Sequence, residues 1–151
     1  MSAIAVETKR TEYRAFTEIE SLVRAFEKAE IARDDWNHRG HLTVACWYLL
    51  CFPAEEAVER MRDSLQRYLS LRGIVTTRER GYHETITVSW MRLVRHYLAQ
   101  TNLDCSLVEL INGLVEYYSD RDFLLRYYSR DSLMSWEART GWVEPDVKPL
   151  P

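Results

Sequence analysis

Long apolar runs and an excess of positive charge are both missing from this sequence. No apolar stretch reaches the length that a bilayer requires, so we expect no membrane segment. Lysine occurs only at Lys9, Lys28 and Lys148, and the net charge is −3, which argues against nucleic acid or a polybasic membrane surface as a partner. The first fifteen residues mix acidic and basic side chains, so no signal peptide is expected either.

Cysteine is scarce as well. Cys46, Cys51 and Cys105 are odd in number, and the first two lie within one apolar segment. A redox pair of Cys46 and Cys51 is disfavoured, because residues five apart on a helix point in different directions. We interpret all three as reduced, buried side chains of a cytoplasmic protein.

The sequence does contain clear helical periodicity. Its 151 residues are the length of a single domain (1–151), and no strand pattern or internal repeat is present. The predicted helices cover about 17–29 or 17–32, 36–52, 53–72, 82–99, 106–118 and 120–128, with a further turn at 136–139. We therefore predict an all-α protein, an up-down bundle of five to six helices, with a loose arm at 1–15 and an extended, proline-rich tail at 141–151.

One of these helices is predicted to lie at the centre of the bundle. Residues 42–52 carry no charge and are apolar all round the helical wheel, which is typical of a helix buried on every side. The first turn of the same helix nevertheless contains His38 and His41, which lie within roughly 60° of each other on its surface. A third histidine, His83, begins the apolar face of helix 82–99, whereas His96 is expected to be exposed.

His38, His41 and His83 are predicted to meet at one end of the bundle. Short connections make consecutive helices antiparallel neighbours, which places the starts of helices 36–52 and 82–99 beside the end of the first helix. The positive end of a helix dipole keeps a first-turn imidazole neutral, which is the form that binds divalent transition metals. We therefore predict a mononuclear site for one such ion, Zn, Fe, Ni or Mn, with these histidines as ligands. No nucleotide or organic cofactor is implied.

Two acidic side chains are candidates to complete this site. Glu27 is ranked first as a fourth ligand, because it faces inward if the first helix ends early, and Glu30 is the alternative if that helix continues. Glu84 points about 100° away from His83, so we expect it to act as a catalytic acid or base, or to orient a ligand, rather than to bind the metal. Its simpler interpretation is a first-turn carboxylate that stabilises the helix dipole.

Several arginines border the same end of the bundle. Arg39, Arg78 and Arg80 are candidates to bind a small polar or anionic molecule, since guanidinium groups grip carboxylates and phosphates. The alternative, which the frequency of weak surface pairs favours, is that they pair with nearby acidic side chains on a solvated rim.

Two segments carry a resemblance to known proteins. Residues 36–49, W-N-H-R-G-H-L-T-V-A-C-W-Y-L, and 81–90, G-Y-H-E-T-I-T-V-S-W, together resemble a family of small uncharacterised bacterial helical proteins. The likeness extends to positions 26–27 and 142–146, so it covers most of the chain. The resemblance implies no activity, but it implies one shared site formed by Glu27, His38, His41, His83 and Glu84.

These observations leave two functions open. The first is a mononuclear metalloprotein which, if it is an enzyme, hydrolyses a small polar substrate or activates water or a thiol for addition to it. The alternative is a metal-free helical module that binds a ligand or a partner protein, in which the same side chains form a buried hydrogen-bond network. In that case the arm and the tail are candidates for self-association as a homodimer.

Overall fold

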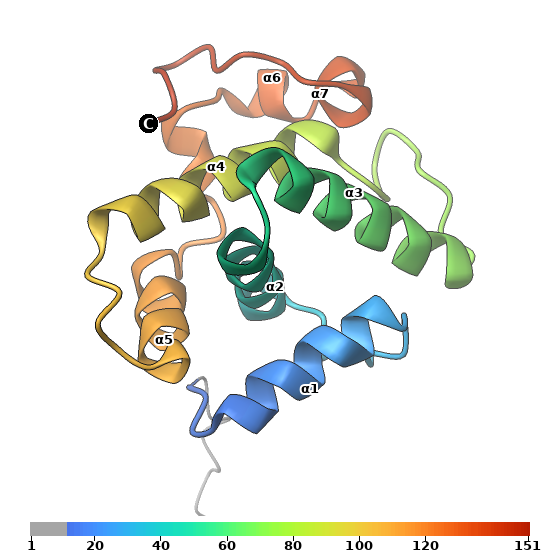
Figure 1. Ribbon diagram of the computed structural model, residues 1–151. Coiled ribbons are helices and arrows are strands. Elements are labelled where there is room, and N and C mark those ends of the chain that lie inside the picture. Colours follow the sequence, from blue (N-terminus) through green and yellow to red (C-terminus); the bar gives the residue numbers. More distant parts are fainter. Residues whose placement is uncertain (1–11) are drawn as a thin grey trace, which may run out of the picture.

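The computed structural model describes residues 12–151, which fold into seven α-helices and one 3₁₀ helix without a strand (Figure 1). The longer helices are α1 (Phe16–Glu27), α2 (His38–Cys51), α3 (Ala54–Leu71), α4 (Glu84–Gln100) and α5 (Leu107–Tyr117). They are followed by η1 (Phe123–Arg126), α6 (Arg130–Leu133) and α7 (Trp136–Thr140). The predicted all-α class is confirmed. None of the helices within 12–151 is both long enough and apolar enough to cross a membrane.

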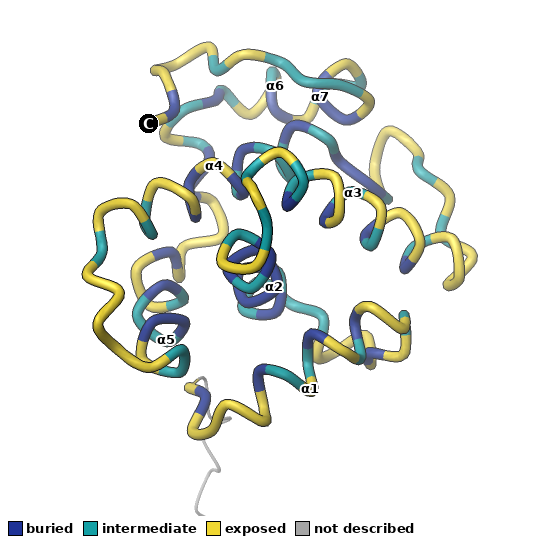
Figure 2. The backbone as a smooth tube through the Cα atoms, in the orientation of Figure 1, coloured by how far each residue is buried: buried dark blue, intermediate teal, exposed yellow. Residues whose placement is uncertain are grey.

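α2 lies at the centre of the molecule. It contacts α1, α3, α4 and α5, which surround it in Figure 1. Its middle is buried on all sides, including Leu42, Val44, Cys46 and Tyr48, whereas Leu50 and Cys51 at its end are exposed. Figure 2 shows this helix largely in dark blue. This is the central buried helix that the uncharged stretch predicts.

The neighbours of α2 cross it. Figure 1 shows α2 almost end-on, whereas α1, α3 and α4 run across the view. This arrangement differs from the strictly alternating order that the short connections predict. A helix that is apolar on every side needs cover from every side, and helices that cross and surround it provide that cover.

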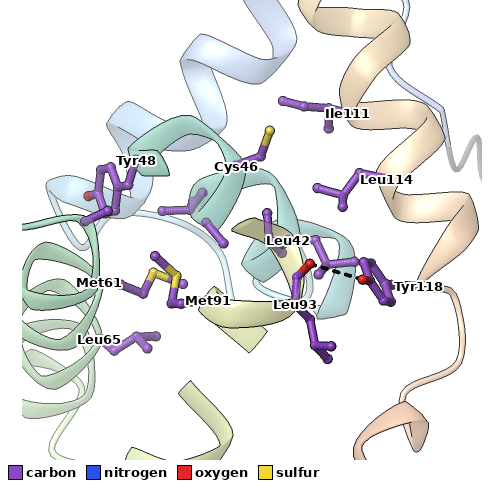
Figure 3. Packing of buried hydrophobic residues seen from close by; sticks show 14 of the residues in the cluster. Leu42, Cys46, Tyr48, Met61, Leu65, Met91, Leu93, Ile111, Leu114 and Tyr118 are labelled. Atoms are coloured by element: carbon purple, nitrogen blue, oxygen red, sulfur yellow. Dashed lines mark hydrogen bonds between the residues drawn. The ribbon is translucent and has the colours of Figure 1, made fainter. Parts of the chain in front are cut away.

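The core is continuous around α2. On one side Leu42 lies near Leu114 of α5, and on the other Met61 of α3 meets Met91 of α4 (Figure 3). All four side chains are almost completely buried. Full burial of each such side chain contributes roughly 1.5–3 kcal/mol to the free energy of folding.

The segment between α1 and α2 differs from the sequence prediction. α1 ends at Glu27, because Ala29 adopts a positive φ of 55° and the chain leaves the helix there. α2 begins two residues later than predicted, since the Asn37 side chain accepts a hydrogen bond from Gly40 N at 3.0 Å and caps the helix. Trp36 therefore stays outside the helix and stacks on Phe26, with ring centroids 4.0 Å apart.

Both ends of the described chain are fastened to the helices. Tyr13, within the predicted arm, is buried, and its hydroxyl shares a hydrogen bond of 2.9 Å with Thr43 Oγ1 of α2. The rest of that arm, residues 1–11, lies outside the described residues. The tail is extended as predicted, but it is attached to α4, because Val143 N donates to Thr85 Oγ1.

All three cysteines are free, but the predicted burial is confirmed at only one of them. Cys46 is buried, whereas Cys51 and Cys105 are exposed. Cys51 is the last residue of α2, and Cys105 lies in the loop before α5, so the core that covers the middle of α2 reaches neither side chain.

Candidate ligand-binding site

Three of the four histidines line one cavity of about 500 Å³, which we call the histidine cavity. His38 and His41 come from the first turn of α2, and His83 directly precedes α4. The other walls are mostly apolar and aromatic, and they include Trp36, Leu42, Ala45, Met61, Leu65, Ile86, Trp90 and Met91.

Both ring nitrogens of His83 take part in hydrogen bonds with the main chain. Nδ1 accepts from Ile86 N at 3.1 Å and so caps α4, which therefore begins two residues later than predicted. Nε2 donates to Leu133 O at 2.7 Å, since a carbonyl oxygen can only accept. Burial lowers the pKa of His83, and the Arg139 guanidinium lowers it further, while the hydrogen bond to Leu133 opposes the shift. His83 is therefore a neutral imidazole in a fixed orientation.

His38 is held in a similar way. Its Nε2 donates to Tyr118 O at 2.6 Å, which ties the start of α2 to the end of α5. Its ring stands edge-on to Trp90, with centroids 5.0 Å apart. His38 thus contributes a wall of the cavity while one of its nitrogens fastens two helices.

His41 differs from the other two. Its ring lies against Trp36, with centroids 4.1 Å apart, and no hydrogen bond joins it to another residue of the described chain. Burial, and to a smaller extent the neighbouring His38 ring, lowers the pKa of His41 to about 4. It is therefore neutral at pH 7, with one nitrogen as a donor and the other as an acceptor.

The donor geometry does not fit a resident metal ion. Within residues 12–151, no group of three or more His, Cys, Asp or Glu side chains is arranged to hold a metal. His83 has no ring nitrogen left for a metal, because both accept or donate hydrogen bonds. Glu27 and Glu30 are exposed, and neither lines the histidine cavity. The buried face of α1 runs through Val23 and Phe26, and Glu27 points about 100° away from Phe26.

Glu84 lines a second hollow, which shares Leu69, Tyr82 and Arg139 with the histidine cavity and which we call the Glu84 hollow. Its carboxylate accepts from Arg62 Nε at 2.8 and 3.0 Å and from the Tyr82 hydroxyl at 2.6 Å. Burial disfavours the charge on Glu84, but the hydrogen bonds from Arg62 and Tyr82 outweigh it and hold the pKa of Glu84 below its usual value. Burial, together with the adjacent Glu84 carboxylate, raises the pKa of Tyr82. Glu84 is therefore an ionised partner of Arg62 and does not face the histidines.

The three arginines predicted to bind a ligand lie in different parts of the structure. Arg80 lines the histidine cavity. The Arg39 guanidinium lies 4.3 Å from the centre of the Tyr13 ring, and that of Arg78 lies 5.4 Å from the centre of a Trp136 ring. Only Arg80 of the three is therefore placed to meet a ligand in the cavity.

Arg139 of α7 is not among the residues that the sequence predicts for the site. It lines both the histidine cavity and the Glu84 hollow, and its Nη1 donates to Gly81 O and Tyr82 O at 3.3 Å each. The sequence places Arg139 in a single predicted turn beyond the main helices, and nothing local marks it as buried. Its position depends on the packing of α7 against α4.

Comparisons with protein-family models, with curated proteins and with solved structures give no match. The resemblance to a bacterial helical family stays a prediction.

Proposed function

We propose that this protein binds a small molecule with a flat, mainly apolar body in the histidine cavity, without a resident metal ion. The observation that supports this most directly is the cavity of about 500 Å³ between α2, α3 and α4. Its volume lies within the range of small-molecule sites, and its apolar walls carry a few polar groups at fixed positions, as such sites usually do.

The two tryptophans favour a flat ligand. Trp36 and Trp90 both line the cavity, and each is held by a histidine ring, His41 and His38 respectively. Phe26 and His41 already lie against the Trp36 ring, with centroids 4.0 and 4.1 Å away. A planar molecule would therefore contact the remaining surface of Trp36 and the Trp90 ring.

The histidines would orient the bound ligand. His38 and His83 each use Nε2 on a main-chain carbonyl, so they shape the wall. His41 has no such partner among the described residues and offers one donor and one acceptor to a ligand. A molecule with an apolar body and one polar edge suits this arrangement.

The metal-dependent enzyme is the less favoured alternative. A metal on His83 would have to replace the hydrogen bond from Ile86 N or the one to Leu133 O. Replacing the first would remove the cap of α4, which costs about 1 kcal/mol.

The test uses N-phenyl-1-naphthylamine, an uncharged aromatic probe that fluoresces strongly in apolar surroundings. We expect saturable binding to the wild type, unchanged by EDTA. Ile86→Trp fills the cavity from α4 and should weaken binding at least about tenfold. His96→Trp introduces the same side chain at an exposed position of α4 and should bind as the wild type does.

Two results would contradict the proposal: a folded wild type that does not bind the probe, or an Ile86→Trp variant that binds it equally well. Binding that EDTA abolishes and zinc restores would instead support the metal-dependent alternative.

A further inference from the structure

Arg139 is a buried cation with incomplete hydrogen bonding. The residue is only 8% exposed. Nη1 donates to two carbonyl oxygens, but Nε is the one buried side-chain nitrogen or oxygen in the described range without a hydrogen-bond partner. Nη2 has no such partner either, and because it is not among the fully covered atoms, it remains accessible.

No carboxylate in the described part of the chain balances this charge. The salt bridges there join Arg24 to Glu20, Arg60 to Glu56 and Arg62 to Glu84. Glu84 lines the same hollow as Arg139, but its two oxygens already accept from Arg62 and from Tyr82.

An uncompensated buried charge is costly, because the guanidinium loses water without gaining an anion. The neighbouring polar groups do not reduce that cost. His83 is neutral, and Glu79, the carboxylate that lines the cavity, is exposed and forms no salt bridge with Arg139 within residues 12–151. The protein therefore holds a charged donor at the wall of an apolar cavity.

We infer that Arg139 receives the anionic group of the molecule bound in the histidine cavity, so that the ligand is an organic oxyanion with a flat apolar body. This inference rests on the function proposed above and specifies the chemical class of the ligand. The accessible Nη2 would donate to a carboxylate or a similar oxyanion, while Nη1 keeps the guanidinium in place on the carbonyls of Gly81 and Tyr82.

The position of Arg139 fits this role. α7 is capped by Ser135, which accepts from Ala138 N, and it packs against α4, so the guanidinium is held by a structured element. The apolar body would lie between Trp36 and Trp90, and its charged end would face α7.

The experiment compares two fluorescent probes with the same aromatic body. 1-Anilinonaphthalene-8-sulfonate carries an anionic group, and N-phenyl-1-naphthylamine lacks it. We expect the wild type to bind the sulfonate at least about tenfold more tightly, as one charge-assisted hydrogen bond of about 1.5 kcal/mol or more would give. In Arg139→Gln this preference should disappear, while the dissociation constant of the uncharged probe changes less than about twofold.

Two variants complete the test. Arg139→Lys keeps the positive charge and should retain part of the preference. Arg78→Gln removes an exposed arginine from the neighbouring loop and should leave the preference unchanged.

Equal binding of the two probes by the wild type would overturn the inference, and this result does not depend on any variant folding. An unchanged preference in Arg139→Gln, or an equal loss of both probes, would also overturn it, since the latter would show a purely structural role. Failure of the uncharged probe to bind would contradict the proposed function itself, so the two failures are distinguishable.

Discussion

The histidine cavity and the Glu84 hollow adjoin the same helix start, yet they hold opposite kinds of polar chemistry. In the cavity, His41 and His83 are neutral, and burial is the main reason for their lowered pKa. In the hollow, Glu84 is ionised, because Arg62 and Tyr82 donate hydrogen bonds to its carboxylate. Burial disfavours the charged form of the titratable groups in both places. Only in the hollow does a partner of opposite charge, Arg62, compensate for this cost.

His83 and Glu84 are adjacent in sequence but belong to different sites. His83 caps α4 and reaches the carbonyl of Leu133, whereas Glu84, the next residue, turns to Arg62 on α3. His83 precedes the helix with extended backbone angles, whereas Glu84 is the first residue of α4, so the two side chains leave the chain in different directions. Their proximity in sequence therefore does not make His83 and Glu84 one catalytic unit.

The largest expected effect comes from removing the imidazole of His83. His83→Ala deletes the cap on Ile86 N and leaves Leu133 O without its donor, and we expect the free energy of unfolding to fall by about 2–4 kcal/mol. Urea denaturation followed by circular dichroism measures this loss. His83→Asn restores the cap alone and should recover about 1 kcal/mol.

His96→Ala, at an exposed position of the same helix, is the matched control and should cost less than about 0.5 kcal/mol. If His83→Ala were as mild as this control, the hydrogen bonds to the main chain would not stabilise the fold.

The next effect is a loss of stability on acidification. The pKa of His41 is about 4 in the folded protein and near 6.5 in the unfolded chain, so the unfolded state binds more protons between these values. Stability should therefore fall as the pH decreases from 6.5 to 4, by about 1–3 kcal/mol for a side chain that keeps some solvent contact. Urea titrations at several pH values measure this slope.

In His41→Gln the slope should become shallower. It should not vanish, because the pKa of His83 is also lowered and contributes with the same sign. An unchanged slope in His41→Gln would show that this imidazole is not buried in its neutral form.

The smallest effect concerns the ion pair of the hollow. A double-mutant cycle of Glu84→Gln with Arg62→Met should give a coupling of about 1 kcal/mol, because the pair is only partly exposed. The exposed pair of Arg60 and Glu56 is the control and should give about 0.3–0.5 kcal/mol.

Glu84→Gln should also leave the affinity for N-phenyl-1-naphthylamine unchanged, since Glu84 does not line the histidine cavity. A large loss of probe binding in this variant would mean that the two hollows form one site.

Much of the fold was predictable from local pattern, and the errors cluster at helix ends. The uncharged stretch 42–52 predicted the buried centre because apolar residues cover the whole wheel. The start of α2 was missed, since the short side chain of Asn37, which local periodicity does not reveal, determines where the helix begins. The predicted helix 120–128 is reduced to η1, followed by α6, because Ser129 caps a new short helix there.

The candidate site was predictable only in part. His38, His41 and His83 line one cavity, but the neighbours of α2 cross it, so the alternating order from which their meeting was predicted is not the arrangement that brings them there. The inward position of Glu27 did not follow, because the apolar face of α1 passes through Phe26 and leaves Glu27 on the solvent side.

Local sequence pattern is enough to establish that the chain is helical, that α2 is central and that imidazoles lie in its first turn, because these features depend on residues a few positions apart. The hydrogen-bond partners of the imidazoles, in contrast, depend on long-range packing. Tyr118 O lies 80 residues from His38, and Leu133 O lies 50 residues from His83. The burial of Arg139 likewise depends on α7 packing against α4. The periodicity of a sequence reflects only contacts between residues a few positions apart. It therefore cannot predict a main-chain acceptor or a buried charge that a distant segment supplies, because that contact forms only when the helices pack together.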